Sequence, residues 1–285
     1  MIMHAINIKY KSGWRLTLII LILVGLASSV GIGVYQGEQL VFERVTVPSA
    51  NVPEALKGRT IAVLSDLHGH ITEENAALLL EGLRKAEPVA ILLAGDMVDR
   101  REAYWPEARA LMEVLPDIAP TYYSYGNHEI ANIERGRALG WLEELGITVL
   151  RNESAVLSLE PGGEKVTLSG LDDRIGFASE RSYILAMNRL RNAGSYQILL
   201  SHRPEYAQDY AAAGFDLVVS GHAHGGQVRL PWIGPLLSPH QGFFPKLAEG
   251  VHVTGDTTHV ISRGLGNKVP FPRLFNPREV VLVGF

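Results

Sequence analysis

Five apolar runs of the chain each end in side chains that can bind a metal ion. The segments read IAVLSDLH, AILLAGDMVDR, TYYSYGNHE, QILLSH and DLVVSGHAH. Apolar runs of this length are typical of buried strands. In α/β folds, ligands bind in the crevice beyond the carboxyl ends of the strands. We therefore expect one polar cavity to collect the side chains at these ends, which are Asp66, His68, Asp96, Asp99, Asn127, His128, His202, His222 and His224.

The residue types at these ends suit divalent metal ions of hard to borderline character. Such ions accept carboxylate oxygen, amide oxygen and imidazole, and a chain without cysteine has no thiolate site. All of these side chains except Asp99 and His128 are predicted ligands. These seven side chains are too many for a single catalytic zinc ion, because such an ion binds three protein ligands and a water. They suit two ions ~3.5–4 Å apart that share one carboxylate, which clamps both oxygens of an in-line displacement.

Each motif alone also has an ordinary structural interpretation. An Asp after a strand often caps a helix, and Gly-Asn often forms a turn. The occurrence of all five motifs in one chain favours a shared site instead. Residues two apart in an extended segment point to the same side, ~6.6 Å apart along the backbone. We therefore expect His222 and His224 to reach different ions of one pair.

The elements that must position these side chains alternate between strand and helix over much of the chain. This order, with strands gathered toward the C-terminus, predicts an α/β domain with a large, partly antiparallel sheet system. Strands are expected at 59–66, 89–96, 120–127, 147–150, 155–159, 165–170, 196–202, 217–219, 251–255, 258–264 and 279–285, and helices at 75–86, 105–115, 135–145, 180–192 and 205–213.

The composition narrows the classes of partner. The chain has 285 residues, of which 47% are hydrophobic, enough for a large core. Its net charge of −4 does not suit a nucleic-acid binder, because such proteins usually carry a basic patch. No protein partner follows from the sequence.

An uncharged apolar segment at 16–36 precedes the predicted domain. At ~1.5 Å per residue it would span roughly 30 Å, the thickness of a bilayer core. Three basic residues precede it, so the positive-inside rule predicts a single-pass anchor with the catalytic domain outside the cytoplasm. A cleaved signal peptide with its apolar core at 16–26 is the alternative. The expected organisation is a cytoplasmic N-terminus at 1–15, an anchor or signal peptide at 16–36, a connector at 37–57 and a catalytic domain at 58–285.

The motifs together resemble a known family. DLH, GDMVDR, GNHE, a later lone His202 and GHAH, in this order, are similar to the motif set of the calcineurin-like metallophosphoesterases. The extension GHAHGGQVRLPWIGPL and the later SRGLG resemble a membrane-associated bacterial subgroup. That subgroup includes phosphodiesterases and UDP-2,3-diacylglucosamine diphosphatase-like enzymes. The resemblance implies a sandwich of two mixed β-sheets flanked by helices.

The resemblance also implies a role for each motif residue. The implied cofactor is a pair of divalent ions, Mn, Fe or Zn. His128 would protonate the leaving group, Asp99 would orient it, and Arg100 is a further substrate-binding candidate beside Asn127 and His128. The implied ligands are Asp66, His68 and His224 for the first ion and Asn127, His202 and His222 for the second, with Asp96 between the two ions.

The resemblance implies a phosphate-ester substrate, and several alternatives stay open within this class. An anchor favours a lipid-linked phosphodiester or pyrophosphate, and the subgroup suggests a UDP-2,3-diacylglucosamine type. Such nucleotide-linked precursors are cytoplasmic, however, whereas the charge rule places the domain outside. A phosphomonoesterase or protein phosphatase of the same fold, and a non-catalytic metal-bound scaffold, are the other hypotheses. The loops at 230–247 and 267–277 combine aromatic with basic residues, which suits either a membrane interface or ordinary packing.

Overall fold

The computed structural model describes residues 2–48, 51–69, 71–137, 139–157, 159, 164–192 and 194–285. The helices are α1 (Ile2–Glu38), α2 (Glu73–Ala86), α3 (Trp105–Val114), α4 (Asn127–Glu134), α5 (Trp141–Glu144), α6 (Glu180–Leu190) and α7 (Ala207–Ala213). The strands are β1 (Leu40–Thr46), β2 (Thr60–Leu64), β3 (Ala90–Leu93), β4 (Thr121–Tyr123), β5 (Thr148–Val149), β6 (Glu153–Leu157), β7 (Val166–Leu171), β8 (Tyr196–Ser201), β9 (Leu217–Ser220), β10 (Arg229–Leu230), β11 (Gly234–Pro235), β12 (Leu237–Ser238), β13 (Gly242–Phe243), β14 (Gly250–Thr254), β15 (Thr257–Ile261) and β16 (Arg278–Gly284).

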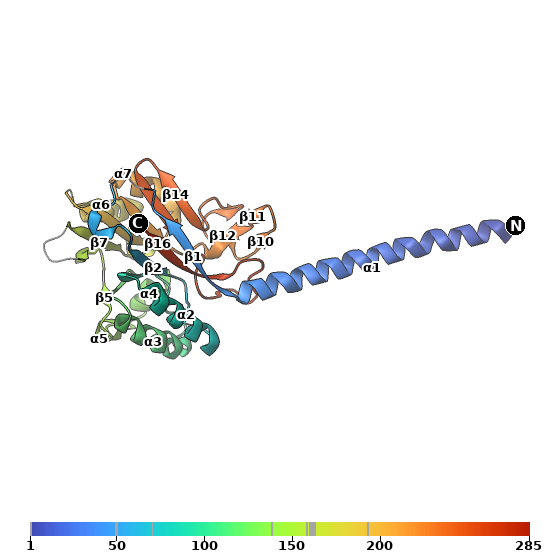
Figure 1. Ribbon diagram of the computed structural model, residues 1–285, viewed down its shortest axis with the longest axis horizontal. Coiled ribbons are helices and arrows are strands. Elements are labelled where there is room, and N and C mark those ends of the chain that lie inside the picture. The colour runs from blue at the N-terminus through green and yellow to red at the C-terminus, as the bar shows by residue number, and fades with distance from the viewer. Residues whose placement is uncertain are drawn as a thin grey trace.

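Two six-stranded sheets form the centre of the domain (Figure 1). One has the order β1-β16-β2-β3-β4-β5 and the other β14-β15-β9-β8-β7-β6. Each mixes parallel with antiparallel pairs: β2 and β3 are parallel, for example, whereas β16 and β2 are antiparallel. Helices α2 to α5 cover the outer face of the first sheet, and α6 and α7 cover the second. The expected sandwich of two mixed sheets flanked by helices is confirmed.

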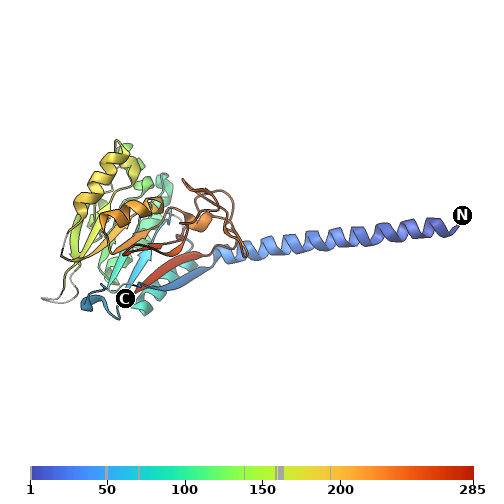
Figure 2. The same cartoon turned by 90° about the horizontal axis from the view of Figure 1, so that it is seen from above.

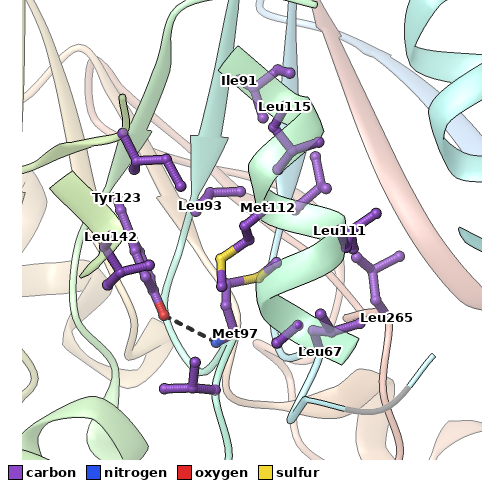
Figure 3. Packing of buried hydrophobic residues seen from close by; sticks show 14 of the residues in the cluster. Leu67, Ile91, Leu93, Met97, Leu111, Met112, Leu115, Tyr123, Leu142 and Leu265 are labelled. Atoms are coloured by element: carbon purple, nitrogen blue, oxygen red, sulfur yellow. Dashed lines mark hydrogen bonds between the residues drawn. The ribbon is translucent and has the colours of Figure 1, made fainter. Parts of the chain in front are cut away.

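The alternation of side chains along each strand builds this layering. Ile61 and Val63 of β2 lie in the core between the two sheets, whereas Ala62 and Leu64 face the helices. Successive residues of a strand point to opposite faces, so a strand covered on both sides is apolar throughout. Figure 3 shows the core on the helix side, where Tyr123 lies close to Met97. This core supports the loop that carries Asp96.

Several elements differ from the sequence-based expectations. The short strands β10 to β13 lie where no strand was expected, and of the helix expected at 135–145 only α5 (Trp141–Glu144) is helical among the described residues. Strand β1 lies within the 37–57 segment expected as a connector, and it pairs with β16 along its whole length. Helix α4 begins at Asn127, whereas the apolar spacing predicted a helix only at 135–145. The polar start of α4 hides its periodicity, because its first residues belong to the GNHE motif. The sequence Pro161-Gly162-Gly163, which predicts a turn between the strands expected at 155–159 and 165–170, lies outside the described residues.

Helix α1 is continuous and projects from the domain (Figures 1 and 2). The part from Trp14 to Glu38 is long and apolar enough to cross a membrane. Its side chains are exposed from Trp14 to Ile32, and Gly33 and Gly37 are buried against the domain. An exposed apolar helix of this length is unusual for a water-facing surface.

Candidate dinuclear metal centre

The five metal-capable strand ends meet at one edge of the sandwich. Strands β2, β3 and β4 are parallel neighbours in the first sheet, and β8 and β9 are parallel neighbours in the second. Backbone hydrogen bonds tie the loops that follow them. The amide of His68 donates to the Asp96 carbonyl at 2.9 Å, and the amide of Gly221 donates to the His202 carbonyl at 3.1 Å. The crevice predicted from the sequence therefore has a rigid backbone.

Much of this backbone adopts the left-handed conformation. The φ angles of Asp66, His68, Asp96, His222 and His224 lie between 50° and 66°. Positive φ is uncommon for residues other than glycine, and such strain of ~1–3 kcal/mol per residue gathers at functional sites. The expectation of an extended backbone from His222 to His224 is wrong, because both residues are left-handed. The turn between them, rather than an extended spacing, aims the two imidazoles.

Asp66, His68 and His224 form the first group of potential ligand atoms. Nε2 of His68 lies 3.0 Å from Nε2 of His224. Oδ1 of Asp66 lies 3.4 Å from Nε2 of His224 and 3.9 Å from Nε2 of His68. The other carboxylate oxygen of Asp66 accepts the amide N–H of His222 at 2.9 Å. Oδ1 is therefore left to face the two imidazoles.

Asp96, His202 and His222 form the second group. Oδ2 of Asp96 lies 3.3 Å from Nε2 of His202, and Nδ1 of His222 lies 3.1 Å from the same Nε2. Nδ1 of His202 lies 2.8 Å from the carbonyl oxygen of Ala94, which fixes the ring and leaves Nε2 for the site. Asn127 lines the cleft that opens over both groups, and its Oδ1 has no hydrogen-bond partner among the described residues.

Asp96 lies between the two groups. Its Oδ2 is 4.0 Å from Nε2 of His68, a member of the first group, as well as 3.3 Å from His202. Its Oδ1 accepts the amide N–H of His128 at 2.8 Å. One oxygen is thus held by the protein while the other faces both groups, as expected of a carboxylate shared by two ions.

The donor set fits two divalent ions. Oδ1 of Asp66 and Oδ1 of Asn127 are both buried without a hydrogen-bond partner in the part of the chain that the structure describes, which is costly unless another group satisfies them. Burial lowers the pKa of His68 well below its usual value and that of His224 to about 4. These imidazoles are therefore neutral at neutral pH, as metal ligation requires. For His202, burial also lowers the pKa, but the Asp96 carboxylate outweighs it and raises the pKa.

His128 and Asp99 lie beside the two groups. The amide N–H of Arg100 donates to Nδ1 of His128 at 3.2 Å, so the neutral ring carries its proton on Nε2, which lies 4.0 Å from Oδ2 of Asp96. Oδ2 of Asp99 lies 3.5 Å from Nδ1 of His128. Burial would raise the pKa of Asp99, but hydrogen bonds from Arg101 and Lys268 lower it. The predicted orienting role of Asp99 stays a prediction.

Sequence reasoning missed two residues near the site. Glu129 is fully buried, and its carboxylate accepts the amide N–H groups of Asp96 at 2.9 Å and Gly126 at 2.8 Å. Glu129 lies three residues after Gly126, at the start of α4, which is the position of a capping-box Glu. This spacing is the sequence signal from which Glu129 could have been found. Lys268 lies 2.8 Å from Asp99, and only the fold brings it there. Arg100, a predicted substrate-binding residue, is not among the residues that line the cleft, and its buried Nε has no hydrogen-bond partner within the described ranges.

A cleft of about 510 Å³ opens over the two groups. Its inner wall carries Asp96, Asn127 and His128 together with the ligand histidines. Its outer wall differs in character, because it combines the Lys268 ammonium with apolar side chains. The apolar and ring-bearing residues of this wall are Leu237, Pro239, His240, Val269 and Phe271.

Comparison with known proteins decides the family. The calcineurin-like phosphoesterase family model matches residues 59–226, more than half of the chain. The chain belongs to the calcineurin-like phosphoesterase family. It is therefore a metallophosphoesterase, as its motifs indicated, and this family uses divalent metal ions.

Three relatives illustrate the range of this metallophosphoesterase family. The chain is 29% identical to the metallophosphoesterase YkuE of Bacillus subtilis over 242 residues, covering 83% of this chain and 82% of YkuE. It is 27% identical to the phosphodiesterase YaeI of Escherichia coli over 184 residues, covering 64% of each chain. It is 30% identical to a transmembrane protein with metallophosphoesterase domain of Danio rerio over 206 residues, covering 65% of this chain and 44% of that protein.

Proposed function

We propose that this metallophosphoesterase is a membrane-anchored, dinuclear hydrolase of a phosphodiester or pyrophosphate bond. The observation that carries the proposal is the position of Asp96 between the two groups of imidazoles, with His128 beside it. Asp66, His68 and His224 hold one ion, and Asn127, His202 and His222 hold the other. Manganese, iron and zinc all suit this mixed oxygen and nitrogen donor set.

The side chains around the ions have separate roles in the reaction. When bound, the two ions supply Lewis-acid charge that activates water and neutralises the phosphoryl oxygens. In its imidazolium form, His128 donates the Nε2 proton to the leaving oxygen and returns to the neutral ring. Asp99 stabilises the imidazolium form at 3.5 Å. Lys268 places a cation at the cleft wall beside Asp99, where it contacts a substrate phosphate together with Asn127.

The substrate proposed for this site is a lipid-linked phosphodiester or pyrophosphate. A UDP-2,3-diacylglucosamine type is its leading member if the cleft faces the cytoplasm, which is the reverse of the side that the charge rule favours. The apolar outer wall of the cleft, with Leu237, Val269 and Phe271, suits an acyl or other apolar substituent next to the phosphate. The likeness to the phosphodiesterase YaeI supports a diester or pyrophosphate over a monoester. Membership of the membrane-associated bacterial subgroup, which GHAHGGQ and SRGLG suggest, is part of the same proposal.

Anchoring by α1 completes the proposed function. The exposed part of α1 from Trp14 to Ile32 would span ~28 Å at ~1.5 Å per residue, close to the thickness of a bilayer core. The likeness to a transmembrane protein of the same family supports this role. The charge rule places the catalytic domain outside the cytoplasm.

Hydrolysis of model substrates by the purified full chain tests the chemistry. We expect manganese-loaded protein to hydrolyse bis-p-nitrophenyl phosphate faster than p-nitrophenyl phosphate. Asp96→Ala and His222→Ala should each lower the rate by at least ~10³-fold, because each removes a ligand that holds the charge at the phosphoryl group. The exposed Asp117→Asn serves as control. Unchanged turnover in either ligand variant would exclude the dinuclear assignment, and preference for the monoester would favour a phosphomonoesterase.

The general-acid role of His128 has its own signature. His128→Asn should lower kcat by ~10²–10⁴-fold for an alkyl ester, which needs a protonated leaving group, and by less for a nitrophenyl ester. An equal loss for both leaving groups would remove the acid role. If the unaltered protein hydrolyses neither ester with manganese, iron or zinc, the non-catalytic scaffold becomes the better hypothesis.

Lipid profiling tests the substrate class. In a strain that lacks this chain, accumulation of a diacylated UDP-sugar would support the leading substrate. An unchanged pool of that precursor would exclude it and leave other lipid-linked diesters or pyrophosphates.

A further inference from the structure

The two small hairpins after the metal site carry exposed apolar side chains. Hairpin β10–β11 exposes Trp232 and Ile233, with exposed fractions of 102% and 64%. Hairpin β12–β13 and the residue after it expose Phe243 and Phe244, at 72% and 58%. Large apolar side chains gathered in this way on a water-facing surface mark an interaction site. We call these four side chains the apolar rim.

The apolar rim is tied to the root of α1 by a chain of direct contacts. The amide of Phe275 donates to the carbonyl of Gly33 at 2.9 Å, and a Cβ at Gly33 would lie 2.8 Å from the Phe275 ring. Phe275 also borders a hollow together with Trp232 and Ile233. The amide of Arg229 at the start of β10 donates to the carbonyl of Leu274 at 2.9 Å. These contacts hold hairpin β10–β11 next to the root of α1.

The length of α1 sets the level of the rim along the membrane normal. The exposed part of the helix ends at Ile32, after ~28 Å of apolar surface. This length matches a bilayer core, so the membrane boundary falls near Gly33, where Phe275 packs. Figures 1 and 2 show the hairpins at the end of the domain from which α1 departs. Tryptophan and phenylalanine at such a boundary lie among the lipid headgroups.

We propose that the apolar rim docks on the surface of the bilayer that holds α1, so that the cleft opens toward the lipid. The inference rests on the proposed anchoring by α1. Leu237 of β12 and the exposed Phe271 line the cleft, and Leu237 pairs in its hairpin with Phe243 of the rim. An exposed Lys246 follows the rim and suits anionic headgroups. A lipid-linked phosphate thus reaches the metal groups without leaving the membrane surface.

Spin labels on the full chain test this docking directly. The chain has no cysteine, so Leu21→Cys, Ile233→Cys and Leu185→Cys each accept one nitroxide. Leu21 lies in α1, Ile233 in the rim, and the exposed Leu185 on α6 is the matched control. The full chain is placed in nanodiscs of phosphatidylcholine and phosphatidylglycerol. Oxygen should increase the spin-relaxation rate of the labels at 21 and 233 more than a water-soluble nickel complex does. The label at 185 should show the opposite preference.

The accessibilities of the labels distinguish failure of the anchoring from failure of the docking. A water-like label at 21 would overturn the anchoring itself. A lipid-like label at 21 with a water-like label at 233 would overturn only the docking. A label at 233 that is shielded from both relaxants would indicate a protein partner or a second copy in place of the bilayer, and would equally overturn it.

A kinetic comparison adds the functional consequence. Trp232→Ser with Phe243→Ser should hydrolyse bis-p-nitrophenyl phosphate within ~2-fold of the unaltered protein, because neither side chain lines the cleft. The same variant should hydrolyse a diacylglycerol p-nitrophenyl phosphodiester in anionic vesicles ~10-fold more slowly, whereas Leu185→Ser should not. Equal rates of the rim variant and the unaltered protein on the vesicle substrate would contradict the proposal. If the unaltered protein hydrolyses only the soluble ester, the lipid substrate class fails while the spin labels still decide the docking.

Discussion

Glu129 shows how much of the site depends on one buried residue that touches none of the predicted ligand atoms. Its carboxylate accepts three backbone N–H groups, from Asp96, Val98 and Gly126, and the hydroxyl of Tyr123 at 2.6 Å. Burial, with the nearby Asp96 carboxylate, raises its pKa to about 7. Glu129 therefore joins the loop after β3 to the start of α4, and so fixes Asp96 relative to Asn127 and His128.

Glu129→Gln tests this positioning at the residue scale. The amide NH₂ would face N–H donors that need an acceptor, so the Asp96 loop should shift. We expect metal affinity to fall by ~10–100-fold, the usual effect of losing an outer partner of a metal site. Metal titration with calorimetric detection measures this change. Glu113→Gln on the exposed face of α3 should leave affinity unchanged, and an equal affinity in both variants would remove the positioning role.

At the scale of elements, the site forms where the ends of β2 and β9 approach closely. A Cβ at Gly221 would lie 1.7 Å from Oγ of Ser65 and 2.2 Å from Oδ2 of Asp66. Only glycine allows the loop after β9 to come this near to the carboxylate. The approach joins the two sheets, because β2 and β9 belong to different ones.

Gly221→Ala should therefore displace Asp66 and disturb the first group of ligand atoms. We expect the bound metal to fall from two ions to one or fewer per chain, with a loss of stability of ~1–3 kcal/mol from overpacking. Elemental analysis and thermal unfolding measure the two effects. Gly140→Ala, where a Cβ would meet nothing within 4 Å, is the control. Retention of both ions in Gly221→Ala would show that the close approach is not needed.

Strand β15 carries a buried histidine, His259, whose titration affects stability. Its Nε2 lies 2.8 Å from Oγ of Ser220, which itself donates to the carbonyl of Ser201. His259 is therefore neutral with its proton on Nε2, and its buried Nδ1 has no partner among the described residues. Burial lowers its pKa to about 3.

This pKa predicts how stability depends on pH. The unfolded chain binds a proton at His259 below a pH of ~6.5, whereas the folded chain does so only near 3. Its contribution to the free energy of unfolding is thus complete above pH ~6.5 and is lost as the pH falls toward 3. In metal-free protein, His259→Gln should reduce the fall in stability between pH 6.5 and 5 by about 2 kcal/mol, as measured by urea unfolding. Parallel pH profiles for the two proteins would contradict this assignment.

For the whole molecule, the orientation of α1 decides which substrates the cleft can meet. We expect alkaline phosphatase fused after Phe285 to be active and a fused green fluorescent protein to be dark, because three cations precede the apolar segment. Carbonate extraction should leave the full chain in the membrane fraction. The reverse reporter pattern would place the cleft in the cytoplasm, where nucleotide-linked lipid precursors occur, and release by carbonate would favour a cleaved signal peptide.

The sequence by itself determined the side chains with metal-binding chemistry, the alternation of most strands and helices, and the family that the comparisons then confirmed. These follow from residue type, local periodicity and motif order, which are properties of neighbours along the chain. Only the tertiary structure decided that β1 completes the first sheet, that five predicted ligands are left-handed, and that Lys268 meets Asp99 across 169 positions. Such contacts depend on how the two sheets pack, because side chains far apart in the sequence share no local pattern.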